Sequence, residues 1–110
     1  MRKRKLDLSD FKISFLAYKE MEYFCRQYKE KKYLISQNSE FSERYKKDIE
    51  LIEQSAIKTD VNLYEFIMLN VTEGIAYEFF DESKRPCGRR QFYEKRKEFF
   101  ARLYRKINCC

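Results

Sequence analysis

Apolar residues recur at spacings near three and four along most of this chain, which is the period of an α-helix with one buried face. A first stripe predicts a long N-terminal helix over about residues 10–36. The polar residues 37–39 interrupt it, and a second stripe from Phe41 to Ala56 predicts an amphipathic helix of about four turns. The first half of the chain is therefore expected to form two helices joined by a short polar turn.

The second half begins with two shorter helical patterns. Asn62 stands three residues before Glu65, an arrangement that fits a helix cap, and Gly74 is well placed to end the helix that follows. A short fourth helix is expected from Ile75 to Glu82, with Ile75, Phe79 and Phe80 facing inward. A turn must follow, because proline at position 86 cannot sit inside a helix.

A last helix is expected from about Arg89 to Lys106. On a wheel of 100° per residue its apolar side chains gather on one side. These inward positions are Phe92, Phe99, Phe100, Leu103 and Ile107. The opposite side carries Arg90, Glu94, Lys97 and Ala101. Arg96 falls within the apolar arc, where its stem can pack while its charged end reaches out to water.

Composition supports one all-α domain of about five helices over residues 1–110. The chain is 44% hydrophobic and 17% aromatic, enough for a real core, and it contains only two glycines and one proline. Its apolar runs are far shorter than the roughly 20 residues needed to cross a bilayer. The basic N-terminal residues are not followed by the apolar stretch of a signal peptide, so a cytoplasmic protein is expected.

Catalytic and metal chemistry is not indicated. The chain has no histidine, which removes the commonest general base, and its four cysteines lack the C-x-x-C spacing of a zinc site. The two glycines lie far apart, so no glycine-rich phosphate loop is present. We expect neither an enzyme, nor a metal site, nor a cofactor. Cys87, at the turn, is interpreted as filling a small gap rather than as a reactive thiol.

Charge is unevenly distributed. Residues 1–5 carry four positive charges, and residues 6–83 carry ten basic against sixteen acidic side chains, a net −6. Residues 84–110 carry ten basic against two acidic side chains, a net +8. A basic C-terminal segment on a mildly acidic body indicates that this end of the chain meets a polyanion, although a solvated basic helix face would look the same.

The elements expected over residues 60–107 have the layout of a helix-turn-helix unit, in which a second, basic helix enters the major groove of double-stranded DNA. Basic residues at the turn and helix start can reach phosphates, and those of the following turns can reach base edges. The predicted DNA-binding residues are Lys84, Arg85, Arg89, Arg90, Gln91, Tyr93, Glu94 and Lys97.

Three segments carry a resemblance to a known group of proteins. Residues 48–53 read Asp-Ile-Glu-Leu-Ile-Glu, residues 69–74 read Leu-Asn-Val-Thr-Glu-Gly, and residues 86–93 read Pro-Cys-Gly-Arg-Arg-Gln-Phe-Tyr. Together with the pair Phe99-Phe100 they resemble small regulators of phages and integrated elements of Gram-positive bacteria, related to the ArpU and RinA late-gene regulators. The resemblance covers roughly residues 45–106. It implies a helix-turn-helix similar to that of sigma factors and a sequence-specific regulator of phage or mobile-element transcription.

A protein-binding function is the alternative. A phage-encoded modulator or inhibitor of a host protein or an immune nuclease, similar to an anti-CRISPR protein, would use the helical scaffold and the basic end as a docking surface. Tyrosines at positions 18, 23, 28 and 33 of the first helix favour this alternative, because tyrosine is enriched at interfaces. The same helix is also expected to pair with a second copy of the chain, through Tyr18 and Phe24, since dimers suit DNA readers.

Overall fold

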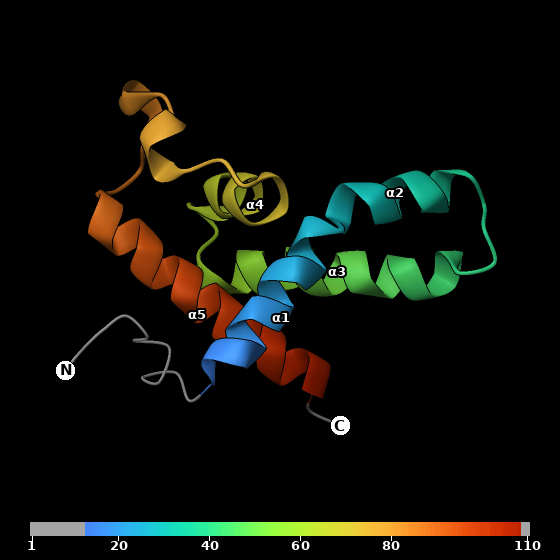
Figure 1. Cartoon of the computed structure of the whole chain (residues 1–110). Coiled ribbons are helices and arrows are strands. Elements are labelled where there is room, and N and C mark those ends of the chain that lie inside the picture. Colours follow the sequence, from blue (N-terminus) through green and yellow to red (C-terminus); the bar gives the residue numbers. More distant parts are fainter. Residues whose placement is uncertain (1–12, 109–110) are drawn as a thin grey trace.

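The computed structural model describes residues 13–108, and every regular element in that range is helical. The elements are α1 (Phe15–Arg26), α2 (Tyr28–Ser36), α3 (Ser42–Thr59), α4 (Tyr64–Glu73) and α5 (Arg89–Asn108), with two short 3-10 turns, η2 (Tyr77–Phe79) and η3 (Glu82–Lys84). Figure 1 shows α1 crossing α5, and α2 and α3 lying side by side as a hairpin of helices. The predicted all-α class is confirmed.

The predicted N-terminal helix is divided into two helices. α1 begins at Phe15, where the Ser14 side chain caps it by accepting a hydrogen bond from the Ala17 amide at 3.0 Å, and the predicted start near residue 10 lies outside the described residues. Gln27 leaves helical geometry with ψ near 0°, and α2 continues in a new direction. The change of direction lets α1 pack on α4 and α5 while α2 packs along α3.

Two polar contacts hold α2 against α3. The ammonium of Lys31 is 2.9 Å from the Asp48 carboxylate and lies 4.1 Å from the centroid of the Phe24 ring, although the Lys31 side chain is buried. One turn earlier, the Tyr28 hydroxyl donates a hydrogen bond to Glu53. A buried charge is tolerated only when it is paired in this way. These contacts explain why Tyr28 and Lys31 of α2 do not face water although their side chains carry polar groups.

The core is built around α5. Its side chains Phe92, Phe99, Phe100 and Leu103 are all buried, as predicted, and they meet Ile52, Ile67 and Val71 from α3 and α4. Phe100 receives the edge of Tyr18 from α1, with the ring centroids 5.1 Å apart. The helical phase predicted for this helix is therefore correct over its first four turns.

Three positions on α5 differ from the prediction. Ala101 is fully buried rather than solvent-facing, because Ile13 and Ala17 at the start of α1 cover it. Ile107, expected in the core, is 36% exposed in the last turn. Arg96 packs its stem inward as predicted, but its guanidinium is bonded to other helices and only 18% of the side chain is exposed.

The guanidinium of Arg96 joins three helices. It donates hydrogen bonds to Asn70 on α4 and to Tyr18 and Glu22 on α1, at 2.9 Å for the Tyr18 hydroxyl and 3.4 Å for the Glu22 carboxylate. It also lies 5.0 Å from the centroid of the Phe100 ring. Charge-assisted hydrogen bonds are about twice as strong as neutral ones, so this cluster orients α5 against α1 and α4.

Helix α4 starts and ends at turns that the sequence only partly anticipated. The predicted Asn62 cap is wrong: the Asp60 carboxylate accepts hydrogen bonds from the Asn62 and Leu63 amides, and α4 begins at Tyr64. Gly74 ends the helix as predicted, in the left-handed conformation at φ 73°, a geometry that favours glycine.

The predicted helix from residue 75 to residue 82 is not formed. Two separate 3-10 turns replace it, and Phe79, expected in the core, is 82% exposed, while Tyr77 and Phe80 are buried. A side chain from the start of α5 and a backbone carbonyl of the turn before it hold this arrangement. The Tyr77 amide donates to the Tyr93 hydroxyl at 3.2 Å, and the Tyr77 hydroxyl donates to the Cys87 carbonyl at 2.8 Å.

Among residues 13–108, no helix combines the length and the apolar character that crossing a membrane would require.

Candidate nucleic-acid interface

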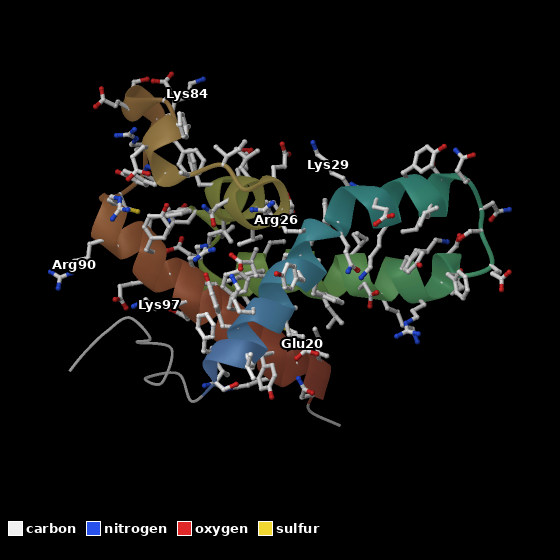
Figure 2. The ribbon with its side chains drawn as sticks, viewed as in Figure 1. Glu20, Arg26, Lys29, Lys84, Arg90 and Lys97 are labelled. Atoms are coloured by element: carbon white, nitrogen blue, oxygen red, sulfur yellow. The ribbon has the colours of Figure 1, made fainter. Side chains whose placement is uncertain are left out.

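Five of the predicted DNA-binding residues meet around one shallow surface hollow at the start of α5. The residues that line it are Arg89, Arg90, Tyr93, Glu94 and Lys97. They lie toward one side of the helix, because residues three or four positions apart, such as Arg90, Tyr93, Glu94 and Lys97, are neighbours on the surface of an α-helix. Figure 2 shows Arg90 and Lys97 along the same edge of α5, with Arg90 extending outward.

Arg90 is an exposed cation of this group that is not engaged with another side chain of the described residues. Its side chain is exposed, and within residues 13–108 it has no hydrogen-bond or ion-pair partner. Lys97 lies about two turns further along, with 20% of its side chain exposed and its ammonium 3.3 Å from the Glu94 carboxylate. A surface ion pair of this kind is weak and exchanges readily with another anion.

Arg89 is engaged with the preceding loop. It forms an ion pair with Glu78, and its guanidinium lies 4.9 Å from the centroid of the Tyr93 ring. The hydrogen bond and the charge of Arg89 lower the pKa of the Glu78 carboxyl, and Glu78 in turn raises the pKa of Arg89. Both groups are exposed, so the pair is screened by salt and sets orientation more than stability.

Arg85 has a structural role in the loop. Its guanidinium donates to the carbonyls of Phe80 and Glu78 at 3.2 and 3.0 Å and lies 4.6 Å from the centroid of the Tyr77 ring. These contacts give hydrogen-bond partners to two carbonyl groups of a segment that forms no α-helix. Arg85 is therefore committed within the chain and does not join the hollow.

Two other predicted site residues are exposed but lie outside the hollow. Lys84 ends η3 at the tip of the loop, well separated from Arg90 in Figure 2. Gln91 follows Arg90 on α5 and faces solvent on a different row of the helix. The eight predicted residues thus form one compact group of five, two exposed flanking residues, and one structural arginine.

Cys87 matches the interpretation of a small residue that fills a gap. It is half-buried against the core, and its carbonyl accepts the Tyr77 hydroxyl. Burial, assisted by the charge of Asp60, raises the pKa of the Cys87 thiol. A raised pKa is opposite to what a nucleophilic cysteine needs. Across the described part of the chain, no cluster of three or more histidine, cysteine, aspartate or glutamate side chains is placed to hold a metal ion.

The connection between the two helices of the predicted unit is longer than a helix-turn-helix requires. The turn of that motif takes three or four residues, whereas residues 74–88 separate α4 from α5 here. With no helix at residues 75–82, the bracing helix would have to be α4, which contacts α5 through Asn70 and Arg96.

Sequence reasoning missed a second group of basic residues, which lies between α3 and the C-terminal half of α5. Lys58 on α3 and Arg102, Arg105 and Lys106 on α5 line one groove. Arg102, Arg105 and Lys106 were counted in the net charge of +8 of residues 84–110. Lys58 lies far from them in the sequence, and only the packing of α3 against α5 brings it beside them.

No protein-family model, no curated protein and no solved structure matches this chain. Its function therefore has to be inferred from its own residues and their arrangement.

Proposed function

We propose that the chain binds double-stranded DNA through the first two turns of α5. The observation that carries the proposal is the exposed Arg90 guanidinium beside Arg89, Tyr93 and Lys97, around one hollow at the start of a helix. Recognition helices contact base edges with their N-terminal residues, and arginine is the side chain that pairs with guanine through two parallel hydrogen bonds.

The start of α5 is also the part of this helix that a groove can reach. Further along, α1 crosses it and buries Ala101, so a duplex cannot lie along the whole helix. The first turn carries Arg89 and Arg90 and no acidic residue, and its free amide groups and helix dipole favour a phosphate. Lys84 is exposed at the tip of the preceding loop, where it would contact the DNA backbone away from the hollow.

The resemblance of residues 69–74 and 86–93 to late-gene regulators supports a more specific proposal. Under it, the chain regulates transcription of a phage or mobile element by binding a particular sequence. Arg90, Gln91 and Glu94 would then contact bases, while Lys84, Arg89 and Lys97 would contact phosphates.

The test is a double charge reversal, Lys84→Glu with Arg90→Glu, measured by anisotropy on a pool of labelled duplexes. Both side chains are exposed, so helix content and melting temperature should stay near those of the parent. Loss of the Lys84 phosphate contact should reduce the log–log salt slope of binding by about 0.9, and loss of the Arg90 base contact should weaken binding further. The matched control is Lys32→Glu with Lys46→Glu on the α2–α3 hairpin, which changes the net charge equally. At a salt concentration that screens long-range charge effects, its affinity for the duplexes should stay close to that of the parent.

A finer variant separates base reading from phosphate binding. Arg90→Lys keeps the charge but loses the planar fork that matches a guanine edge. Sequence preference should fall by about 10-fold or more while affinity for unrelated duplexes stays near the parent's. If the parent binds no duplex at about 50 mM salt, or if the hairpin control weakens binding as much as the Lys84 and Arg90 reversal, the DNA proposal is wrong.

A protein-binding function is the second candidate, and the exposed aromatic side chains favour it. Tyr23 on α1 and Tyr33 on α2 are 66% and 62% exposed, whereas Tyr18 and Tyr28 are engaged inside the fold. A modulator or inhibitor of a host protein or immune nuclease would present such residues to its partner. Replacing both exposed tyrosines by serine should abolish binding to that protein partner while leaving duplex binding unchanged.

Pairing of α1 with a second copy of the chain is also proposed. The contact surface would be a different face of α1 from the one that the sequence indicated. Tyr18 and Phe24 pack against the chain's own core, so they are not the contact surface. Phe15, Leu16 and Tyr23 are the exposed large side chains that α1 offers instead. Sedimentation of the parent at micromolar concentration distinguishes a dimer from a monomer, and Leu16→Glu should dissociate a dimer formed through this face.

A further inference from the structure

A groove runs between α3 and the C-terminal half of α5, away from the hollow at the start of α5. The two helices pack antiparallel, so Lys58 near the end of α3 lies beside Arg102, and Lys47 near its start lies beside Lys106. The central part has a volume of about 380 Å³, and Leu51 and Ser55 contribute to its lining. The volume falls within the range of ligand pockets in proteins.

The lining of this groove is predominantly basic. Its charged residues are Lys47, Lys58, Arg102, Arg105 and Lys106 on the positive side and Glu50 and Glu98 on the negative side. Glu98 is already shared between Lys95, at 3.5 Å, and Arg102, at 3.4 Å. The Arg102 guanidinium is further oriented by a hydrogen bond of 3.2 Å to the Thr59 hydroxyl. Cations in a concave, partly apolar groove attract polyanions more strongly than the same cations on a flat surface.

One end of the groove opens toward a pair of aromatic rings. The adjoining hollow shares Leu51 and Lys106 with the groove and is also lined by Phe41, Tyr45 and Arg44. The Phe41 ring is 53% exposed, and its centroid lies 6.0 Å from that of Tyr45, which stands on the next turn of α3. The contact with Tyr45 helps to orient the exposed ring at the mouth of the basic groove.

We propose that this groove, with the Phe41 and Tyr45 rings at its end, binds a short stretch of single-stranded nucleic acid. A positively charged groove that follows the backbone, together with exposed aromatic faces on which bases stack, is the combination that single-strand binding uses. The helical rise places Lys47 and Lys58 roughly 16 Å apart along α3, a length suited to a few nucleotides. The bases of a duplex are already stacked and paired, so a duplex cannot use the Phe41 ring in the same way.

This site is independent of the proposed duplex site. Its residues belong to α3, to Phe41 immediately before it and to the last two turns of α5, whereas Arg90 and Lys97 belong to the first turns of α5. The phenylalanines of α5, which are Phe92, Phe99 and Phe100, are buried and cannot stack on a base. The two sites therefore take different ligands, and each can fail without the other.

The test measures the anisotropy of labelled oligothymidylate and oligouridylate of about ten nucleotides at about 50 mM salt. The first variant, Phe41→Ala, should weaken binding by about 5- to 100-fold, because it removes one stacking surface. Phe41→Tyr keeps a ring and should bind like the parent. The matched control is Phe79→Ala, which removes another exposed phenylalanine, 82% exposed on η2, and should leave single-strand binding unchanged.

The second variant tests the groove charges. Lys58→Glu with Lys106→Glu changes two exposed residues and should reduce the log–log salt slope for the single strand by about 1.4. The reversal of Lys84 and Arg90 serves as the charge-matched control and should leave that slope close to the parent's. Far-UV circular dichroism of each variant confirms that its helices are retained.

Three results would overturn the proposal. The parent could show no binding of either oligonucleotide at low salt, or Phe41→Ala could bind as tightly as Phe79→Ala. Polyglutamate could also compete as effectively as unlabelled oligothymidylate, which would mean that the groove takes acidic protein segments and does not stack bases. Preference for oligouridylate over oligothymidylate, or the reverse, would support the site and identify which single strand it takes.

Discussion

Replacement of Arg96 by methionine should destabilise the protein strongly, because one guanidinium connects α1, α4 and α5. Methionine keeps the apolar stem that packs among the aromatic rings, but it removes the donors to Asn70, Tyr18 and Glu22. The Asn70 side chain is buried, so its carbonyl oxygen would be left without this donor. The three ring contacts of the guanidinium would be lost as well.

The size of the loss follows from the burial of each partner. Leaving a buried acceptor unsatisfied costs about 1–3 kcal/mol, and a hydrogen bond to a charged group contributes about 1.5–3 kcal/mol. The carboxylate of Glu22 is 22% exposed and water can replace part of its contact, so these contributions do not add in full. We expect Arg96→Met to lower the free energy of unfolding by about 2–4 kcal/mol. Replacement of a buried ion pair is close to neutral only when both partners are replaced.

Urea unfolding followed by circular dichroism measures this effect. With an m-value of about 2 kcal/mol per molar, the midpoint should fall by about 1–2 M. Arg90→Met is the matched control on the same helix, and its exposed, unpartnered side chain should contribute less than about 0.5 kcal/mol. Arg96→Lys should recover only part of the loss, because one ammonium cannot reproduce the planar set of donors. An Arg96→Met midpoint within about 0.3 M of the Arg90→Met midpoint would show that the three-helix contact does not stabilise the fold.

Three further outcomes are expected. Gly74→Ala should cost about 1–2 kcal/mol, measured by urea unfolding, because φ is 73° and an added methyl group would collide with the Arg26 side chain; equal stability would contradict this backbone assignment. Cys25 is fully buried, and burial raises the pKa of its thiol, so in a variant with the other cysteines replaced by serine it should react with a thiol reagent only after unfolding; rapid labelling of the native protein would refute the packing of α1. Burial, and then the hydrogen bond to Glu53, raise the pKa of Tyr28. Its neutral form therefore stabilises the fold fully below about pH 10, the pKa of an unperturbed phenol, and this contribution is lost as pH rises toward the folded value. Unfolding measured against pH should show the stability difference between the parent and Tyr28→Phe shrinking above about pH 10, and a constant difference would argue against the contact.

The buried face of α5 could be predicted from the sequence because it depends on local geometry alone. Phe92, Phe99 and Leu103 recur at the period of the helix, and any helix through these residues places them on one face. The same reasoning correctly placed the end of α4 at Gly74, where the left-handed conformation favours glycine. Arg89, Arg90, Tyr93 and Lys97 meet around one hollow for the same local reason, because they share one stretch of helix.

The segment from residue 75 to residue 82 could not be predicted in this way. Its apolar residues fit a helix of two turns, but a helix that short is only marginally stable and depends on its tertiary contacts. Here Tyr93, Cys87 and Arg85 supply hydrogen bonds to Tyr77 and to the carbonyls of the loop, and 3-10 turns result. The predicted compact helix-turn-helix depended on that missing helix.

What the sequence determined by itself is the class of the protein and the faces of its long helices, since both follow from residues within one or two turns of each other. What the tertiary structure decided is how the charged residues are used. Arg96 is enclosed because Asn70 and Tyr18 approach it from two other helices, and Ala101 is buried because α1 crosses it. The groove beside Lys58 exists only because α3 packs antiparallel to α5. The same arginine or lysine can be a solvent-facing charge, an internal connector or part of a binding surface, and the partners that decide among these roles come from distant parts of the chain.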